Sequence, residues 1–163
     1  MATPSEGLRP LIAAVRARSC RTEVDTRFGS MGSRSQHISI GIDRPVTVVY
    51  VVAADPLNLP QWAAGLAGST VEQDGEQWFT ESPLGRVTFT FAPRNDFGVL
   101  DHDVTLPSGE TVYNPLRVIS DGNGCEVIFT LRQRPEMSDE EFERDADAVG
   151  QDLAALKSLV ETD

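Results

Sequence analysis

The chain has 163 residues and a mass of 17.8 kDa, with 40% hydrophobic and 24% charged residues. That length suits one globular domain and is too short for two of ordinary size. The formal net charge of −11 argues against binding to nucleic acid or to anionic membranes, and no apolar run approaches the roughly 20 residues that cross a bilayer. We therefore predict no nucleic-acid partner and no membrane insertion.

The two cysteines, Cys20 and Cys125, have neither the spacing of metal ligands nor that of a redox motif. Such sparse use favours a reducing, cytoplasmic compartment without a disulfide framework. The sequence also lacks the glycine-rich nucleotide-binding loops and the nucleophile motif of α/β-hydrolases. We predict neither a metal nor another cofactor.

The first 36 residues differ from the rest in charge and composition. They carry six arginines against three acidic residues, a net charge of +3, whereas residues 37–163 carry −14. Their single apolar patch is too short to offset an ordering entropy of about 1–2 kcal/mol per residue. We expect 1–36 to be a disordered extension, which could lie upstream of a natural start at Met31. An Arg-rich targeting peptide and a partner-binding helix are the alternatives. Residues 37–163 form the predicted domain.

The domain begins with a strand and two short helices. Isoleucines alternate with other residues over 38–42, which is typical of a half-buried strand. Asp43 before Pro45 predicts a helix that ends near residue 53. Asp55-Pro56 predicts a second short helix that ends between residues 62 and 65.

Six short strands follow, separated by turn signals such as Asp74-Gly75. Loops this short imply an antiparallel meander. Pro115 cannot donate to a strand ladder, so it indicates a bulge or an edge in its strand. The predicted ranges are 70–73, 76–81, 86–91, 97–106, 111–120 and 125–132.

A long amphipathic helix is predicted over 138–161. Ser138 and Glu141 fit a capping box, and Met137 with Phe142 fits a hydrophobic staple. Acidic residues in the first turn suit the helix dipole. The apolar face of this helix consists of Phe142, Ala146, Val149, Leu153, Leu156 and Val160.

This order of elements resembles the helix-grip fold of the START-like (SRPBCC) superfamily over about 37–163. The resemblance rests on the terminal helix and on IGIDRPVTVVYVVAADPLNLPQWAAGL at 40–66, where DPLNLPQW matches the D-P-x-x-x-P-x-W that members often have. It implies an α+β fold in which a seven-stranded antiparallel sheet curves around the C-terminal helix and encloses a hydrophobic cavity, with two short helices after strand one. The superfamily includes polyketide cyclases and ligand-carrying domains but has no shared catalytic triad, so function must be argued from residues that face the cavity.

The lengths of the turns predict which side chains face the cavity, because the register of strand pairing determines on which face of the sheet each side chain lies. A loop centred on Ser108-Gly109 pairs Val104 with Tyr113 and places His102, Tyr113 and Arg117 on one inward face. A three-residue loop at 122–124 pairs Arg117 with Phe129. The opposite face then carries Val99, Asp101, Asp103, Asn114, Leu116 and Val118.

In the hairpin of the predicted strands 76–81 and 86–91, a loop at Pro83-Leu84 pairs Trp78 with Phe89. The expected apolar lining is Trp78, Val87, Phe89, Phe91, Leu100, Val104, Val127, Phe129, Val149, Leu153 and Leu156. Apolar walls with a few convergent polar groups are typical of a small-molecule site. As ligand-binding residues we predict Trp78, Phe89, Phe91, Leu100, Val104, Phe129, Val149 and Leu153.

Three polar residues of the inward face are the candidate catalytic residues. His102 could serve as a general base, with Arg117 and Tyr113 stabilising an enolate. Each also has a structural interpretation. His102 could be a hydrogen-bonded core histidine, and Tyr113 an amphipathic core aromatic. Arg117 could form a salt bridge to a helix carboxylate such as Asp145 or Asp152. Strand alternation places Asp101 and Asp103 opposite the imidazole, which favours a solvated sheet face over a metal site.

Three functions are compatible with this sequence. The first is binding of a small hydrophobic ligand between the sheet and the C-terminal helix, without chemistry. The second is a polyketide cyclase/dehydratase-like enzyme that uses His102, Arg117 and Tyr113. The third is a partner-binding regulator of the chaperone-stimulating type.

Overall fold

The computed structural model describes residues 34–82 and 85–162. The extension predicted over 1–36 falls almost entirely outside the described residues and stays a prediction. Cys20 and the loop residues 83–84 also lie outside them. Within the described part, the first strand begins at Ser35.

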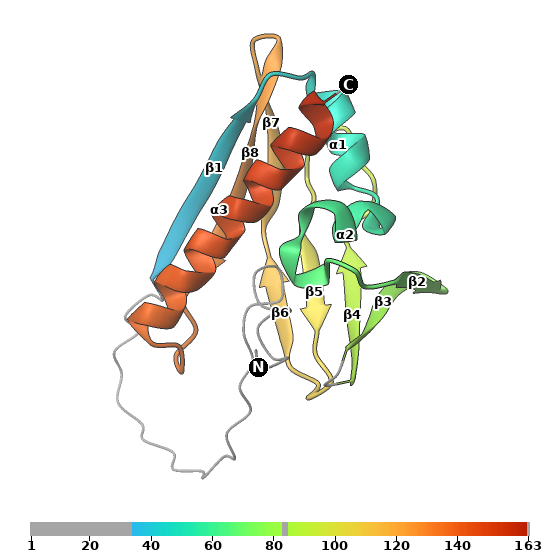
Figure 1. Cartoon of the computed structure of the whole chain (residues 1–163), viewed down its shortest axis with the longest axis vertical. Coiled ribbons are helices and arrows are strands. Elements are labelled where there is room, and N and C mark those ends of the chain that lie inside the picture. Colours follow the sequence, from blue (N-terminus) through green and yellow to red (C-terminus); the bar gives the residue numbers. More distant parts are fainter. Residues whose placement is uncertain (1–33, 83–84, 163) are drawn as a thin grey trace.

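Within the described residues, eight strands form two antiparallel sheets (Figure 1). One sheet has the strand order β1-β8-β7, and the other has the order β2-β3-β4-β5-β6. The expected single sheet of seven strands is therefore wrong, although the α+β class is as predicted. The strands are β1 (Ser35–Ile42), β2 (Val71–Asp74), β3 (Gln77–Ser82), β4 (Gly85–Phe91), β5 (His102–Thr105), β6 (Thr111–Asn114), β7 (Leu116–Asp121) and β8 (Gly124–Arg132).

The additional strand arises at Pro115, which divides the strand predicted over 111–120 into β6 and β7. Proline has no backbone N–H, so it cannot donate a ladder bond. On either side of it the partner changes: β6 pairs with β5, and β7 pairs with β8. The proline carbonyl still accepts a hydrogen bond from the Thr130 N–H at 3.0 Å.

A short stretch of backbone before β5 joins the two sheets at this break. The Val118 N–H donates to Gly98 O, and the Leu100 N–H donates to Leu116 O, both at 2.9 Å. Gly98 has a φ of +69°, and a Cβ at this position would lie 1.9 Å from Val118 O. Only glycine fits such a close approach. The predicted strand over 97–106 therefore bridges the sheets with its first half and forms β5 with its second.

The Asp101 carboxylate completes the hydrogen bonding of this seam. It accepts a hydrogen bond from the Leu116 N–H at 3.0 Å and another from the Tyr113 hydroxyl, and it forms an ion pair with Arg117. Asp101 is only 8% exposed, so the expectation of a solvated carboxylate is wrong at this residue. Arg117 therefore forms a salt bridge, as in its structural interpretation, but with Asp101 and not with a carboxylate of the C-terminal helix.

A broken helical pair follows β1, as the sequence predicts. The Asp55 carboxylate caps the second part by accepting from the Leu57 N–H at 3.0 Å. The first part begins after Pro45 without a side-chain cap, and the Asp43 N–H instead donates to Glu161 Oε1 at 2.7 Å. These elements are α1 (Val46–Ala53), η1 (Pro56–Asn58), α2 (Leu59–Trp62) and η2 (Ala64–Leu66).

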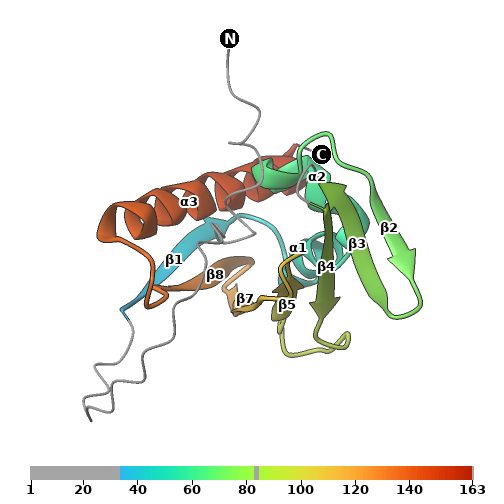
Figure 2. The same ribbon diagram turned by 90° about the horizontal axis from the view of Figure 1, so that it is seen from below.

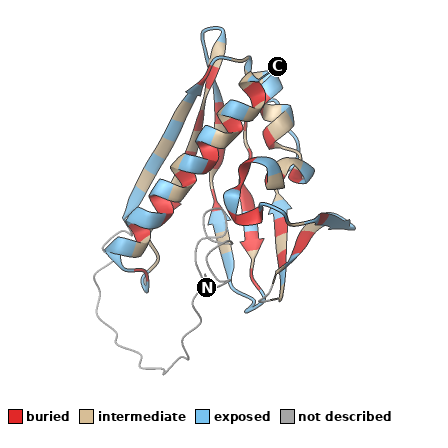
Figure 3. Ribbon diagram, viewed as in Figure 1, coloured by how far each residue is buried: buried red, intermediate tan, exposed pale blue. Residues whose placement is uncertain are grey.

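The long helix α3 (Asp139–Glu161) confirms the sequence prediction in detail. Its capping box is present, with the Glu141 N–H donating to Ser138 Oγ and the Ser138 N–H donating to the Glu141 carboxylate. All six residues of the predicted apolar face are buried. Figure 3 shows this buried stripe facing the sheets, and Figure 2 shows α3 lying along one face of the three-stranded sheet. No helix within the described ranges is long and apolar enough to cross a membrane.

We expect Asp101→Ala to lower the free energy of unfolding by about 2–4 kcal/mol, because it leaves the Leu116 N–H and the Arg117 charge without their acceptor. Asp103→Ala is the matched control, since Asp103 is exposed and lies two residues further along, in β5. Its effect should stay within about 0.5 kcal/mol. Urea denaturation of both variants measures the difference, and equal effects would contradict the role of Asp101 at the seam.

Candidate functional site

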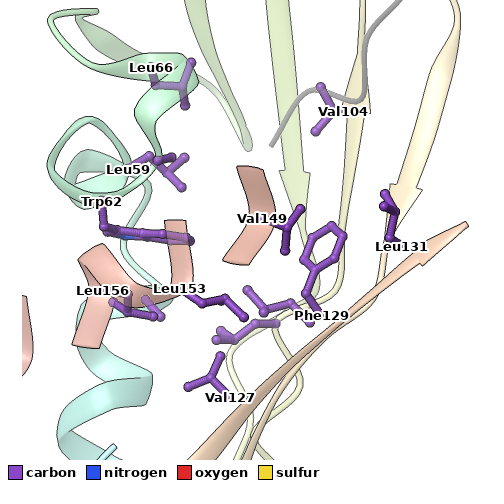
Figure 4. Packing of buried hydrophobic residues seen from close by; sticks show 14 of the residues in the cluster. Leu59, Trp62, Leu66, Val104, Val127, Phe129, Leu131, Val149, Leu153 and Leu156 are labelled. Carbon is purple, nitrogen blue, oxygen red and sulfur yellow. The ribbon is translucent and has the colours of Figure 1, made fainter. Parts of the chain in front are cut away.

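The predicted lining residues gather in one cluster between the sheets and α3. Trp78 and Phe91 are half-buried and pack against this cluster. Figure 4 shows side chains from α3, β8 and β5 pointing toward one another, with the Trp62 indole of α2 pointing into the same cluster. Fully buried members are Val87, Phe89, Leu100, Val104, Val127, Phe129, Val149, Leu153 and Leu156.

The backbone of α3 is not equally close to all the strands. It packs mainly on β1 and α2, and to a lesser extent on α1 and β8, whereas β2 to β6 approach it less. The region between α3 and the five-stranded sheet is therefore spanned by side chains. Their sizes and polar atoms determine which molecule could enter it.

The hairpin of β3 and β4 has the predicted register. Trp78 pairs with Phe89, and Thr80 pairs with Val87. Because paired residues share a face, these side chains line the interior together. The Thr80 hydroxyl donates to Thr70 O at 2.9 Å, so this polar group is satisfied within the protein.

The predicted register of β5 and β6 is wrong by one residue. His102 pairs with Asn114, and Asp103 pairs with Tyr113. The Leu106 N–H donates to Glu110 O at 2.9 Å and closes a loop that is one residue shorter than expected. Gly109 has a φ of +86° in this loop, the geometry of a three-residue hairpin loop with a glycine bulge.

The predicted register of β7 and β8 is also wrong by one residue. Asp121 pairs with Gly124 across a two-residue turn, so Arg117 pairs with Ile128 and not with Phe129. The inward positions of β7 are consequently Leu116 and Val118, both of which are buried. The inward face of β8 is as predicted.

These register differences separate the candidate catalytic residues. His102 faces the interior and is 2% exposed, as expected. Tyr113 is 52% exposed, and it meets Arg117 at Asp101 on the opposite face. The expectation that all three share an inward face is therefore wrong.

His102 is held in one orientation by two neighbours. Its Nδ1 lies 3.1 Å from Leu100 O, and its ring stacks on that of Phe91 with the centroids 4.8 Å apart. A carbonyl can only accept, so Nδ1 carries the proton. Burial lowers the pKa of His102 below its ordinary value of 6.5, which keeps the imidazole neutral at pH 7. Nε2 is then a hydrogen-bond acceptor, and it has no partner within residues 34–82 and 85–162.

Asn114 is the site residue that sequence reasoning missed, because the register error placed it on the outer face. It is 3% exposed and lies directly opposite His102 on the next strand. Its Nδ2 donor has no hydrogen-bond partner in the part of the chain that the structure describes. The signals that could have revealed it are Pro115, which ends the strand beside it, and Gly109, which shortens the loop.

Two further buried polar groups lie on α3 and α2. One carboxylate oxygen of Asp152 accepts from the Ala64 N–H of η2 at 2.9 Å, and the other has no partner among the described residues. The same is true of Trp62 Nε1, which is also buried. Burial raises the pKa of Asp152 to about 6, and the hydrogen bond from Ala64 opposes that shift only in part.

Metal binding has no support in the described residues. No group of three His, Cys, Asp or Glu side chains gathers there in a geometry that could hold an ion. His37 Nδ1 lies 2.9 Å from the Thr130 hydroxyl, across from it on β8. Cys125 is buried and is not in a disulfide.

Comparison with known proteins establishes the fold. No family model and no curated protein sequence matches the chain. Among solved structures, it is similar to Aha1 from Colwellia psychrerythraea (TM-score 0.61, 15% identity, 78% of this chain and 96% of that one). It is also similar to Ara h 8.0201 (TM-score 0.57, 10% identity, 81% and 100%).

A third similar structure is DynU16, a protein of the dynemicin biosynthetic locus. The TM-score is 0.60 at 13% identity over 78% of this chain, which spans 47% of that protein. Together these likenesses show that the chain shares the fold of these three proteins. At such low identities they carry the fold alone and not an activity.

Replacing Asn114 with leucine should leave the free energy of unfolding unchanged within about 0.5 kcal/mol or raise it, because its Nδ2 donates to none of the described residues. Asn95→Leu is the contrast. The Asn95 side chain donates to the carbonyls of Pro93 and Val99 and accepts from the N–H groups of Phe97 and Val99. Its loss should cost about 2–4 kcal/mol. Thermal and urea unfolding test the contrast, and a large loss for Asn114→Leu would show that Asn114 stabilises the fold.

The raised pKa of Asp152 predicts a pH-dependent stability. The folded state holds the Asp152 proton to about pH 6, against an ordinary pKa of 3.8, so this residue favours folding at low pH. The contribution fades as the pH rises from about 4 through 6. Asp152→Asn should therefore gain stability relative to the original protein between pH 4 and 7. Asp147→Asn, at an exposed position of α3, should show no such gain. Parallel slopes in urea unfolding across this range would refute the assignment.

Proposed function

We propose that this protein binds a small hydrophobic molecule between its five-stranded sheet and α3, as a binding or carrier module without chemistry. The observation that carries the proposal is two buried polar atoms, His102 Nε2 and Asn114 Nδ2, on residues that pair across β5 and β6; neither atom has a hydrogen-bond partner among the described residues. The Phe91 ring stacks on His102, and the next inward pair along the same strands, Phe89 and Val104, is fully buried.

Buried polar groups in folded proteins are nearly always hydrogen-bonded, and leaving one unpaired costs about 1–3 kcal/mol. Apolar walls with a few unpaired polar groups are what a preformed small-molecule site offers. The predicted ligand-binding residues fit this proposal, since all eight belong to the interior cluster or pack against it. The fold supports it too, because the START-like superfamily includes ligand-carrying domains.

The two alternatives have less support. The cyclase mechanism needed Arg117 and Tyr113 beside His102, and both lie on the other face of the sheet, so it is not proposed again. The regulator rests on the resemblance of the fold alone. The cytoplasmic compartment and the absence of a nucleic-acid partner stay predictions from composition.

Nile red, a neutral apolar dye, should bind the full chain saturably with one dye per protein. Leu153→Phe places extra volume in the interior and should weaken this binding at least about fivefold, since overpacking costs roughly 1–3 kcal/mol. Leu57→Phe makes the same change at an exposed residue and should have no effect. Fluorescence titration measures both, and circular dichroism checks that each variant is folded.

Equal dye binding by the two variants would place the dye outside the interior and contradict the proposal. Absence of saturable binding to the original protein would contradict it as well.

A further inference from the structure

We propose that the ligand is uncharged and carries a hydroxyl group, which donates a hydrogen bond to His102 Nε2 and accepts one from Asn114 Nδ2. This inference rests on the proposed function and names the chemistry of the ligand at that site. It follows from the protonation of the His102 imidazole, the position of the Asn114 side-chain amide and the distribution of charge in the interior.

The first step is that the two polar atoms have opposite roles. His102 donates its Nδ1–H to the Leu100 carbonyl, so Nε2 carries no proton and can only accept a hydrogen bond. Nδ2 of Asn114 can only donate. A ketone or an ether oxygen could serve Asn114 but not His102. A hydroxyl has one donor and two acceptor sites, so a single oxygen can satisfy both.

The second step is that the two atoms are held where one group could reach them. His102 and Asn114 are cross-strand partners, and such pairs have Cβ atoms about 4.5–5.5 Å apart. Phe91 stacks on the face of the His102 imidazole, and the Leu100 carbonyl accepts a hydrogen bond from Nδ1 at its edge. Together these contacts fix the direction of the Nε2 lone pair. A site with oriented groups binds its ligand with a small loss of entropy.

The third step concerns charge. Among residues 34–82 and 85–162, no lysine or arginine is buried, and the buried acidic residues are Asp101, Asp145 and Asp152. A fatty acid or another carboxylate would enter this interior without a counter-charge, at a large desolvation cost. A neutral alcohol or phenol carries no such cost.

The experiment compares naphthalene probes that differ in one group, using calorimetry on the full chain at pH 7.5. The hydroxyl probes are 2-naphthol and 2-naphthalenemethanol, which stand for phenols and alcohols. We expect at least one of them to bind about tenfold or more tightly than 2-methoxynaphthalene, which accepts but cannot donate. Naphthalene and 2-naphthoate should also bind at least about tenfold more weakly.

Two variants test whether the polar pair produces this preference. His102→Phe and Asn114→Leu should each reduce this preference to less than about threefold, because each removes one of the two hydrogen bonds that the hydroxyl makes. Circular dichroism and urea unfolding check that each variant is folded. Asp103→Asn, at an exposed position of the same strand, should keep the full preference.

The outcomes separate the two proposals. Equal binding of naphthalene, 2-methoxynaphthalene and the hydroxyl probes would overturn the hydroxyl inference while leaving the apolar site intact. A preference that survives in both variants would overturn the roles of His102 and Asn114. Tightest binding by 2-naphthoate would overturn the neutral ligand. If neither Nile red nor any naphthalene binds saturably, the proposed function itself fails.

Discussion

The lack of an N–H on Pro115 is the constraint on which the rest of this structure depends. A strand that would have run through residues 111–120 cannot continue its ladder there, so its two halves take different partners. The seam between the sheets needs a further acceptor for the Leu116 N–H, and the Asp101 carboxylate supplies it. Burying that carboxylate in turn requires a counter-charge, which Arg117 provides. One missing donor thus accounts for three polar residues on the outer side of the sheet.

The same break sorts the polar groups into two sets with different energetics. On the outer face, Asp101, Tyr113 and Arg117 satisfy one another, which is the arrangement expected of a structural cluster. On the inner face, His102 and Asn114 keep an acceptor and a donor that no described residue uses. Local rules of good structure are broken mainly at functional sites, so the inner pair is the better candidate for function although the outer residues carry more charge.

Sequence reasoning succeeded where a pattern determines its own geometry. The capping box at Ser138 and the six apolar positions of α3 depend on helical periodicity alone, and the hairpin of β3 and β4 depends on one loop length that was identified correctly. It failed where two loops were each judged one residue too long. Because side chains alternate along a strand, an error of one residue moves every side chain to the other face. This error of register placed Tyr113 and Arg117 on the predicted inward face beside His102 and placed Asn114 on the predicted outer face.

The unpaired inner groups also affect the stability of the whole domain. Each buried unpaired polar atom costs about 1–3 kcal/mol, against a total stability that is typically about 5–15 kcal/mol for a domain. The fold offsets this cost elsewhere, through the capped α3, the hydrogen-bonded seam and the apolar cluster around Phe89 and Leu153. A ligand that satisfied His102 and Asn114 would bind the folded state alone, so occupancy of the site would stabilise the fold by mass action. Binding and stability are therefore coupled through two side chains that pair across neighbouring strands, at the end of β6 just before Pro115.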